Sequence, residues 1–211
     1  MDSGRTLEPK FFRRRLQYVM VQRTYKVPGG PNDCICVMSP FSAVMDTEKR
    51  ELQKTFTYRN LSSTQKLHED LASNASYWPI AKFRMQFYET HIPPKQMIVR
   101  KKKYNFANST TIMSAYGYAL DPPFWQFLYS RDTCAVVNVL PITFIHTAGP
   151  PLSGIRRKPH CELWITANLN NTEWDIKHRT KLTLCHSYFK RLCDISNVQS
   201  VYIPELCART Q

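Results

Sequence analysis

Two segments in the second half of the chain show the clearest pattern of hydrophobic and polar residues. Residues 135–145 are almost continuously apolar, which is typical of a strand covered on both faces. Residues 161–169 alternate between apolar and polar side chains from Cys161 and Glu162 onward, which is typical of a half-buried strand. A loop rich in glycine, proline and basic residues joins them. The pattern predicts two central strands of a sheet that present a basic loop.

Alternation elsewhere predicts further strands. It is clearest at residues 81–89, where Phe83, Met85 and Phe87 face away from a basic side. Weaker strand patterns occur at residues 16–27, 55–59, 179–185 and 198–203. Helical patterns are short and occur at residues 62–75, 124–129 and 188–193. We therefore expect an α+β fold, with a mostly antiparallel twisted sheet and a few short helices packed on it.

The length and composition predict a single domain. The chain has 211 residues, of which 43% are hydrophobic, so it can bury a substantial core. Residues 1–10 are polar and are expected to form a loose arm, and residues 11–211 to form the domain. No apolar run resembles a signal peptide or a membrane-spanning segment. This predicts a cytosolic protein, with the nucleus as an alternative location.

The net charge of +13 predicts a polyanionic partner. Three basic clusters are candidates for binding nucleic acid or an anionic membrane surface. They are Arg13, Arg14 and Arg15; Arg100, Lys101, Lys102 and Lys103; and Arg156, Arg157 and Lys158. The alternative is that these clusters are solvated surface without a dedicated partner.

Seven cysteines are an odd number for a closed set of disulfides. In a reducing cytosol we expect them to be free thiols, mostly in the core. Cys34 and Cys36 lack the second cysteine pair of a zinc knuckle. The densest group of metal-ligand residue types matches no zinc module in its spacing, so we expect no metal site. That group consists of His178, Cys185, His186 and Cys193.

The sequence offers no support for catalysis. It contains no glycine-rich phosphate loop, no His-Glu-x-x-His and no Gly-x-Ser-x-Gly. Its 16 acidic residues form no close pair in an apolar setting, such as acid–base chemistry requires. We therefore expect a protein that is not an enzyme and has no cofactor.

Three segments resemble the matrix proteins of negative-strand RNA viruses, nearest to the rhabdovirus type. They are Thr55-Phe56-Thr57-Tyr58 with the helical pattern that follows, Pro122-Pro123-Phe124-Trp125, and Glu162-Leu163-Trp164-Ile165-Thr166. The resemblance implies an α+β domain that self-associates, coats the nucleocapsid and contacts the inner leaflet of a membrane through basic residues.

The first hypothesis is therefore a viral matrix-type assembly protein that bridges ribonucleoprotein and anionic membrane and forms homo-oligomers. It would be found in the virion, the host cytoplasm and at the inner membrane surface. The alternative is a basic nucleic-acid-binding viral regulator, namely a silencing suppressor, movement protein or coat protein. A metal-dependent enzyme or zinc module is a third hypothesis.

Overall fold

The computed structural model describes residues 17–27, 34–39, 43–46, 51–60, 78, 80–88, 106–114, 124–131, 133–140, 159–167 and 177–207. Most of these residues form β-strands. The strands are β1 (Gln17–Arg23), β2 (Ile35–Ser39), β3 (Ala43–Asp46), β4 (Glu51–Arg59), β5 (Ile80–Tyr88), β6 (Phe106–Ser114), β7 (Phe124–Ser130), β8 (Cys134–Leu140), β9 (Cys161–Ala167) and β10 (Gln199–Ser200). Two helices are described, α3 (Lys177–Leu192) and α4 (Pro204–Cys207).

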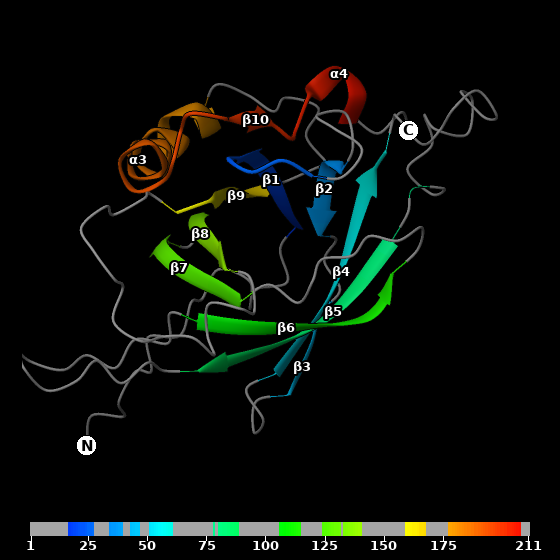
Figure 1. Ribbon diagram of the computed structural model, residues 1–211. Coiled ribbons are helices and arrows are strands. Elements are labelled where there is room, and N and C mark those ends of the chain that lie inside the picture. Colours follow the sequence, from blue (N-terminus) through cyan, green and yellow to red (C-terminus); the bar gives the residue numbers. More distant parts are fainter. Residues whose placement is uncertain are drawn as a thin grey trace, which may run out of the picture.

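The sheet closes on itself. Strands β1, β2 and β4 to β9 pair in chain order, and β9 pairs back with β1, which makes a closed antiparallel ring of eight strands. Tyr18 lies opposite Thr166 and Arg23 opposite Glu162 in the closing pair. Strand β3 extends the sheet beside β4, and β10 pairs with β1. Figure 1 shows the strands curling around an enclosed interior, with α3, β10 and α4 gathered on one side.

Alternating side chains on the ring strands produce the inner core. In β4, Leu52, Lys54, Phe56 and Tyr58 are buried, whereas the residues that alternate with them are partly or fully exposed. Because successive side chains of a strand point to opposite faces, one face of each strand lines the interior. The buried residues of this inner cluster are Tyr18, Met20, Val37, Leu52, Phe56, Tyr58, Ala81, Phe83, Met85, Phe87, Trp125, Phe127, Ala135, Val137, Trp164 and Val201.

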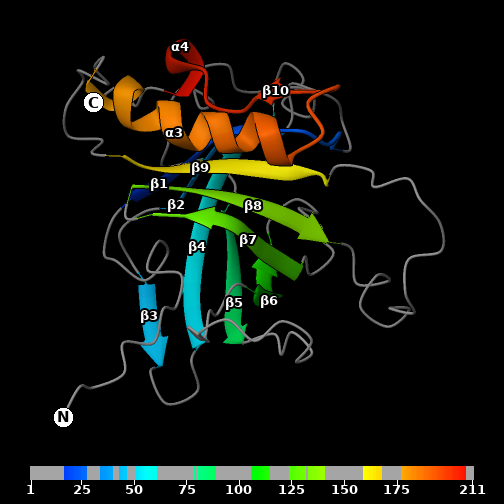
Figure 2. The same ribbon diagram turned by 90° about the vertical axis from the view of Figure 1, so that its left-hand side faces the viewer.

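Helix α3 covers the outer face of the ring at β8 and β9 (Figure 2). Cys185 and Phe189 of α3 and Cys193 directly after it recur every four residues, so they lie on one side of this segment and are buried against the sheet. This explains why Cys134–Asn138 in β8 is buried on both faces, as its continuous apolar pattern predicted.

Three disulfides attach the C-terminal segment to this outer face. Cys134 is bonded to Cys185 and Cys161 to Cys193, which joins β8 and β9 to α3. Cys36 is bonded to Cys207, which joins β2 to α4 across 171 residues. Each closed loop restricts the unfolded chain and stabilises the fold by roughly 2–5 kcal/mol. The expectation of seven reduced thiols is therefore wrong, and Cys34 is the free cysteine.

The start of β2 has an irregular backbone. Cys34 and Cys36 have φ angles of 49° and 54°, which is the left-handed region that costs a residue with a Cβ about 1–3 kcal/mol. Three hydrogen bonds hold this conformation. The Cys34 N–H donates to Asn60 Oδ1 at 2.8 Å, the Cys36 N–H donates to the Val201 carbonyl at 2.8 Å, and Arg23 Nη1 donates to the Cys34 carbonyl at 2.8 Å.

The predicted α+β fold class is wrong. The described chain is mostly β, and the sheet is closed on itself instead of forming a layer under several helices. Residues 124–129, predicted to be helical, form β7, because Trp125 and Phe127 alternate into the inner core. Residues 179–185, predicted to be a strand, belong to α3.

Other sequence predictions agree with the structure or lie outside its described part. The strand predicted at residues 81–89 corresponds to β5, and the one at 161–169 corresponds to β9. The helix predicted at residues 62–75 lies outside the described residues. The division into an arm at residues 1–10 and a domain at 11–211 stays a prediction. Within the described residues, no helix is long and apolar enough to cross a membrane.

Candidate ligand-binding site

Aromatic rings converge in the interior of the ring of strands. Phe56 contributes to the centre of this group, with its ring centroid 5.3 Å from that of Phe83 and 5.5 Å from that of Trp164. The Trp125 and Trp164 ring centroids are 5.8 Å apart. Tilted and edge-on contacts at these distances are favourable for aromatic side chains. The interior therefore offers an aromatic surface contributed by strands from around the whole ring.

Lys54 is a charged residue on this aromatic surface. It follows the alternation of β4, lies opposite Phe83 in β5, and its side chain is only 1% exposed. Its Nζ lies 4.4 Å from the centroid of the Tyr18 ring and has no hydrogen-bond partner among the described residues. Burial lowers the pKa of Lys54 to about 8, because the protein interior solvates an ammonium poorly. The group therefore remains mainly protonated at neutral pH.

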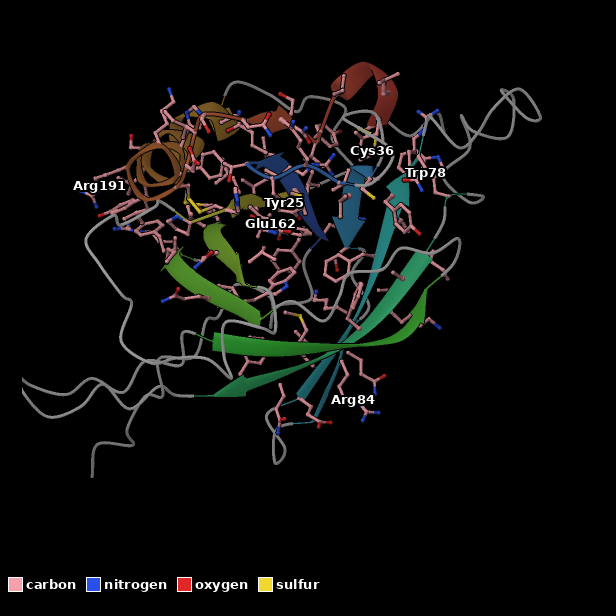
Figure 3. All side chains as sticks on the ribbon, viewed as in Figure 1. Tyr25, Cys36, Trp78, Arg84, Glu162 and Arg191 are labelled. Atoms are coloured by element: carbon pink, nitrogen blue, oxygen red, sulfur yellow. A yellow bond between two sulfur atoms is a disulfide. The ribbon has the colours of Figure 1, made fainter. Side chains whose placement is uncertain are left out.

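Glu162 is the second charged residue of the interior, on the same face of β9 as Trp164. The Tyr25 hydroxyl donates a hydrogen bond to Glu162 Oε1, and Trp164 Nε1 donates one to Oε2 at 2.7 Å. Figure 3 shows Tyr25 and Glu162 next to each other. Burial raises the pKa of Glu162, and the two hydrogen bonds and the charge of Arg23 act in the opposite direction. Each carboxylate oxygen thus has a donor from the protein itself.

Arg23 places a positive charge near the Glu162 carboxylate and donates hydrogen bonds to neighbouring segments. It lies opposite Glu162 in the closing strand pair and is 1% exposed. Its Nε donates to Gln199 Oε1 at 2.9 Å, and its Nη1 donates to the Cys34 carbonyl. The guanidinium therefore supplies both a positive charge near Glu162 and a link from β1 to β2 and β10.

The two charged residues lie toward different ends of β1. Tyr18, which Lys54 contacts, is opposite Thr166, and Thr166 is four residues along β9 from Glu162. Four residues of strand span about 13 Å at about 3.3 Å each. A closed ring of eight strands has an interior that is either filled by side chains or able to hold one small ligand. The geometry thus combines two separated charged residues with an aromatic surface between them.

The predicted binding residues are not tested by this structure. Arg13, Arg14 and Arg15, Arg100 to Lys103, and Arg156 to Lys158 all lie outside the described residues. Their binding of polyanions stays a prediction of the sequence alone.

The candidate metal ligands are separated in the structure. Cys185 and Cys193 are held in two different disulfides, so neither thiolate is available to a metal. Burial and the neighbouring charge of Lys190 lower the pKa of His186. The side chain of His178 lies outside the described part of the chain. Among the described residues, no three histidine, cysteine, aspartate or glutamate side chains are grouped as a metal site would require.

Comparison with known proteins identifies the family. A family model described as tick histamine binding protein matches residues 10–209. The chain belongs to this family. It is also similar in structure to Japanin from Rhipicephalus appendiculatus, solved bound to cholesterol, with a TM-score of 0.45, 10% sequence identity, and coverage of 95% of this chain and 96% of that one. No curated protein sequence matches the chain.

Family membership overturns the viral interpretation. The resemblance to rhabdovirus matrix proteins is wrong, and so is the alternative of a viral nucleic-acid-binding regulator, because the family model covers nearly the whole chain. Within these segments, residues 55–58, 124–125 and 162–166 lie in β4, β7 and β9, and strands with such side-chain patterns occur in unrelated proteins. The predicted partners, namely ribonucleoprotein or RNA, an anionic membrane and further copies of the chain, are wrong for the same reason.

The predicted location is also wrong. A cytosolic or nuclear protein was expected because no signal segment was recognised, and the virion and inner membrane surface were expected from the resemblance to matrix proteins. Membership of a tick family excludes the virion, and three disulfides indicate an oxidising compartment. The protein was also predicted not to be an enzyme. The family is named for binding a small molecule, which agrees with that prediction.

Sequence reasoning missed the buried charged residues Arg23, Lys54 and Glu162. The strand predicted at residues 55–59 begins after Lys54, although Leu52, Lys54, Phe56 and Tyr58 form one continuous alternation. Glu162 was placed on the polar side of its strand, which would normally face water. Its neighbour on that side is Trp164, and a large aromatic residue on a nominally polar face was the available signal that this face is buried.

Proposed function

We propose that this protein binds one small, mostly apolar molecule inside the ring of strands and releases it chemically unchanged. The observation that carries the proposal is the buried Lys54, an ammonium on an aromatic surface without a hydrogen-bond partner among the described residues. Ligand sites are typically concave, largely apolar and equipped with a few polar groups that fix the orientation of the ligand. The interior of this protein has that composition.

We further propose that binding takes place outside the cell. Disulfides persist in oxidising environments, and this chain uses six of its seven cysteines in three of them. They attach α3 and α4 to the outer face of the sheet and leave the interior unaltered. A scaffold fixed in this way suits a protein that captures a ligand, because a rigid interior loses little entropy on binding.

Histamine is the second candidate, since the family is named for it. A cationic amine requires a carboxylate, and Glu162 is the carboxylate of the described interior. Burial raises the pKa of Glu162, because the interior solvates a carboxylate poorly, and a bound cation would favour the charged form. The Tyr25 and Trp164 hydrogen bonds already satisfy its two oxygens, however, so histamine would have to compete with two donors from the protein.

The test uses the interior tryptophans. N-phenyl-1-naphthylamine, a neutral apolar fluorophore, is titrated into the oxidised protein, and energy transfer from tryptophan to the probe is measured. We expect saturable transfer that is reduced by Trp164→Phe and by Trp125→Phe, because both rings lie in the inner cluster. The matched control is Trp78→Phe, since Trp78 packs in the outer cluster. Transfer that depends on Trp78 alone, or no saturable binding, would contradict the proposal.

Histamine is tested on the same protein by calorimetry. Tight binding that is lost in Glu162→Gln favours the amine, and the absence of heat at high histamine concentration removes that candidate while leaving the fluorophore result unaffected.

A further inference from the structure

We infer that the ligand carries a carboxylate group and that Lys54 binds it inside the ring of strands. This inference rests on the proposed function and specifies the chemical class of its ligand, an amphipathic organic acid.

The position of Lys54 supports this inference first. Its neighbours on the same face of β4 are Leu52 and Phe56, and its cross-strand neighbour is Phe83, so the ammonium is surrounded by apolar side chains. Lysine side chains in proteins normally reach water with their charged end, and burial without a partner is costly. An ammonium kept at such a position is explained by a partner that arrives with the ligand.

The protein does not supply that partner from its described residues. Glu162 is engaged by Tyr25 and Trp164 and lies toward the other end of β1. Glu51, three residues before Lys54, points to the opposite face of β4, where its carboxylate lies 3.9 Å from Arg84 Nε. The lowered pKa of Lys54 has burial as its cause and no compensating carboxylate.

Tyr18 compensates the ammonium only in part. The face of its ring lies 4.4 Å from Nζ, and a cation–π contact of this kind stabilises a charge without forming a directional hydrogen bond. Among the described residues, no group accepts a hydrogen bond from the three N–H donors of the ammonium. A carboxylate matches both the charge and the donors, whereas a hydroxyl or carbonyl group matches only the donors.

The remainder of the ligand would contact the aromatic surface. Phe56 and Phe83 are in contact with each other beside Lys54, and Phe56 continues to Trp164. A hydrocarbon or aromatic body attached to the carboxylate is buried by these rings, which favours binding through the hydrophobic effect. A cationic amine placed beside Lys54 would instead be repelled.

The test compares three probes with the same apolar chain and different head groups, namely decanoate, decanol and decylammonium. Their affinities for the oxidised protein are measured at neutral pH by displacement of N-phenyl-1-naphthylamine and by calorimetry. We expect decanoate to bind about tenfold or more tightly than decanol, as a hydrogen bond between charged groups produces, and decylammonium to bind least.

Variants of Lys54 then test whether this residue causes the preference for decanoate over decanol. Lys54→Met should bind decanol and the naphthylamine as before and lose the preference for decanoate, and Lys54→Arg should keep it. The matched control is Lys82→Met, which removes a lysine from the exposed side of β5 and should change none of the affinities. If Lys54→Met does not fold, the comparison of the three probes on the unaltered protein and on Lys54→Arg decides the question.

The outcomes separate this inference from the proposed function. Equal affinity for decanoate and decanol overturns the inference that the ligand carries a carboxylate, and leaves the proposed binding function intact. Tightest binding of decylammonium, lost in Glu162→Gln, also overturns it in favour of an amine ligand. Failure of all three probes and of the naphthylamine to bind overturns the proposed function itself.

Discussion

The Nζ of Lys54 lies 4.4 Å from the centroid of the Tyr18 ring, inside a closed sheet. Lys54 is in β4 and Tyr18 is in β1, and β2 lies between these two strands. The two side chains therefore meet on the interior face of the sheet, across the intervening strand β2. It joins a costly buried charge to the face of an aromatic ring, and the properties of this pair can be measured without knowing the ligand.

Replacing Lys54 by methionine should stabilise the protein in the absence of ligand. The substitution keeps a long unbranched side chain and removes an uncompensated buried charge, so the free energy of unfolding should rise by about 1–3 kcal/mol. Urea unfolding at pH 7 measures this change. Lys82→Met, on the exposed side of β5, should change the free energy by less than about 0.5 kcal/mol. A Lys54→Met protein that is less stable than the unaltered one would show that the ammonium has a partner.

The contribution of Lys54 to stability should depend on pH between about 8 and 10.5. Its pKa is about 8 in the folded protein and 10.5 is the ordinary value. Across this window the unfolded chain binds more protons than the folded one, so the free energy of unfolding rises with pH, by up to about 3 kcal/mol in total. Below pH 8 both states are protonated and the cost of burial is present in full.

The measurement is the difference in unfolding free energy between the protein and Lys54→Met as a function of pH. This difference isolates Lys54 from other groups that titrate in the same range. Both proteins carry Cys34→Ser, which prevents exchange between the free thiol and the disulfides at high pH. A difference that stays constant from pH 7 to 11 would contradict a lowered pKa.

Glu162 should be important for stability as well as for the shape of the interior. Glu162→Leu removes the acceptor of both Tyr25 and Trp164 and the charge that faces Arg23, so we expect a loss of about 3 kcal/mol or more. Glu162→Gln keeps one acceptor oxygen and should lose less. Thermal unfolding compares the two variants.

The control for Glu162 is Glu51→Gln. Glu51 forms an ion pair with Arg84 at 3.9 Å, and the Arg84 side chain is 51% exposed. Such surface pairs contribute little, so this variant should differ from the unaltered protein by less than about 1 kcal/mol. Equal effects at Glu51 and Glu162 would argue against a buried role for the latter.

The number of free thiols tests the disulfide assignment. Denatured protein without reductant should react with one equivalent of a thiol reagent, corresponding to Cys34, and fully reduced protein with seven. Removing the Cys161–Cys193 bond by a double alanine substitution should cost about 2–5 kcal/mol. The variant should still show one reactive thiol without reductant, and 7 − 2 = 5 thiols after full reduction. Seven reactive thiols without reductant would contradict the oxidising compartment.

The cysteines illustrate why pairing could not be predicted. Cys185 and Cys193 were compared with metal-binding spacings, whereas Cys185, Phe189 and Cys193 form one stripe of a helix. Recognising that stripe requires knowing that the segment is helical, and the nearby alternation of Leu182 and Leu184 favoured a strand. The partners Cys134 and Cys161 lie in two strands that are distant in sequence, so only the packing of α3 on β8 and β9 brings the sulfur atoms together.

The amino-acid pattern was sufficient to predict the strand character of β5, β8, β9 and the second half of β4, because strand geometry places successive side chains on opposite faces. It also determined which residues share a face. Which face is enclosed depends on how the strands pair and what packs on them, because alternation defines two faces and does not specify what covers them. The pairing of β9 with β1 encloses Lys54, Glu162 and Trp164 together, and α3 buries the other face of β9. A polar side that would be solvated in an open sheet thereby becomes part of the enclosed interior of the ring.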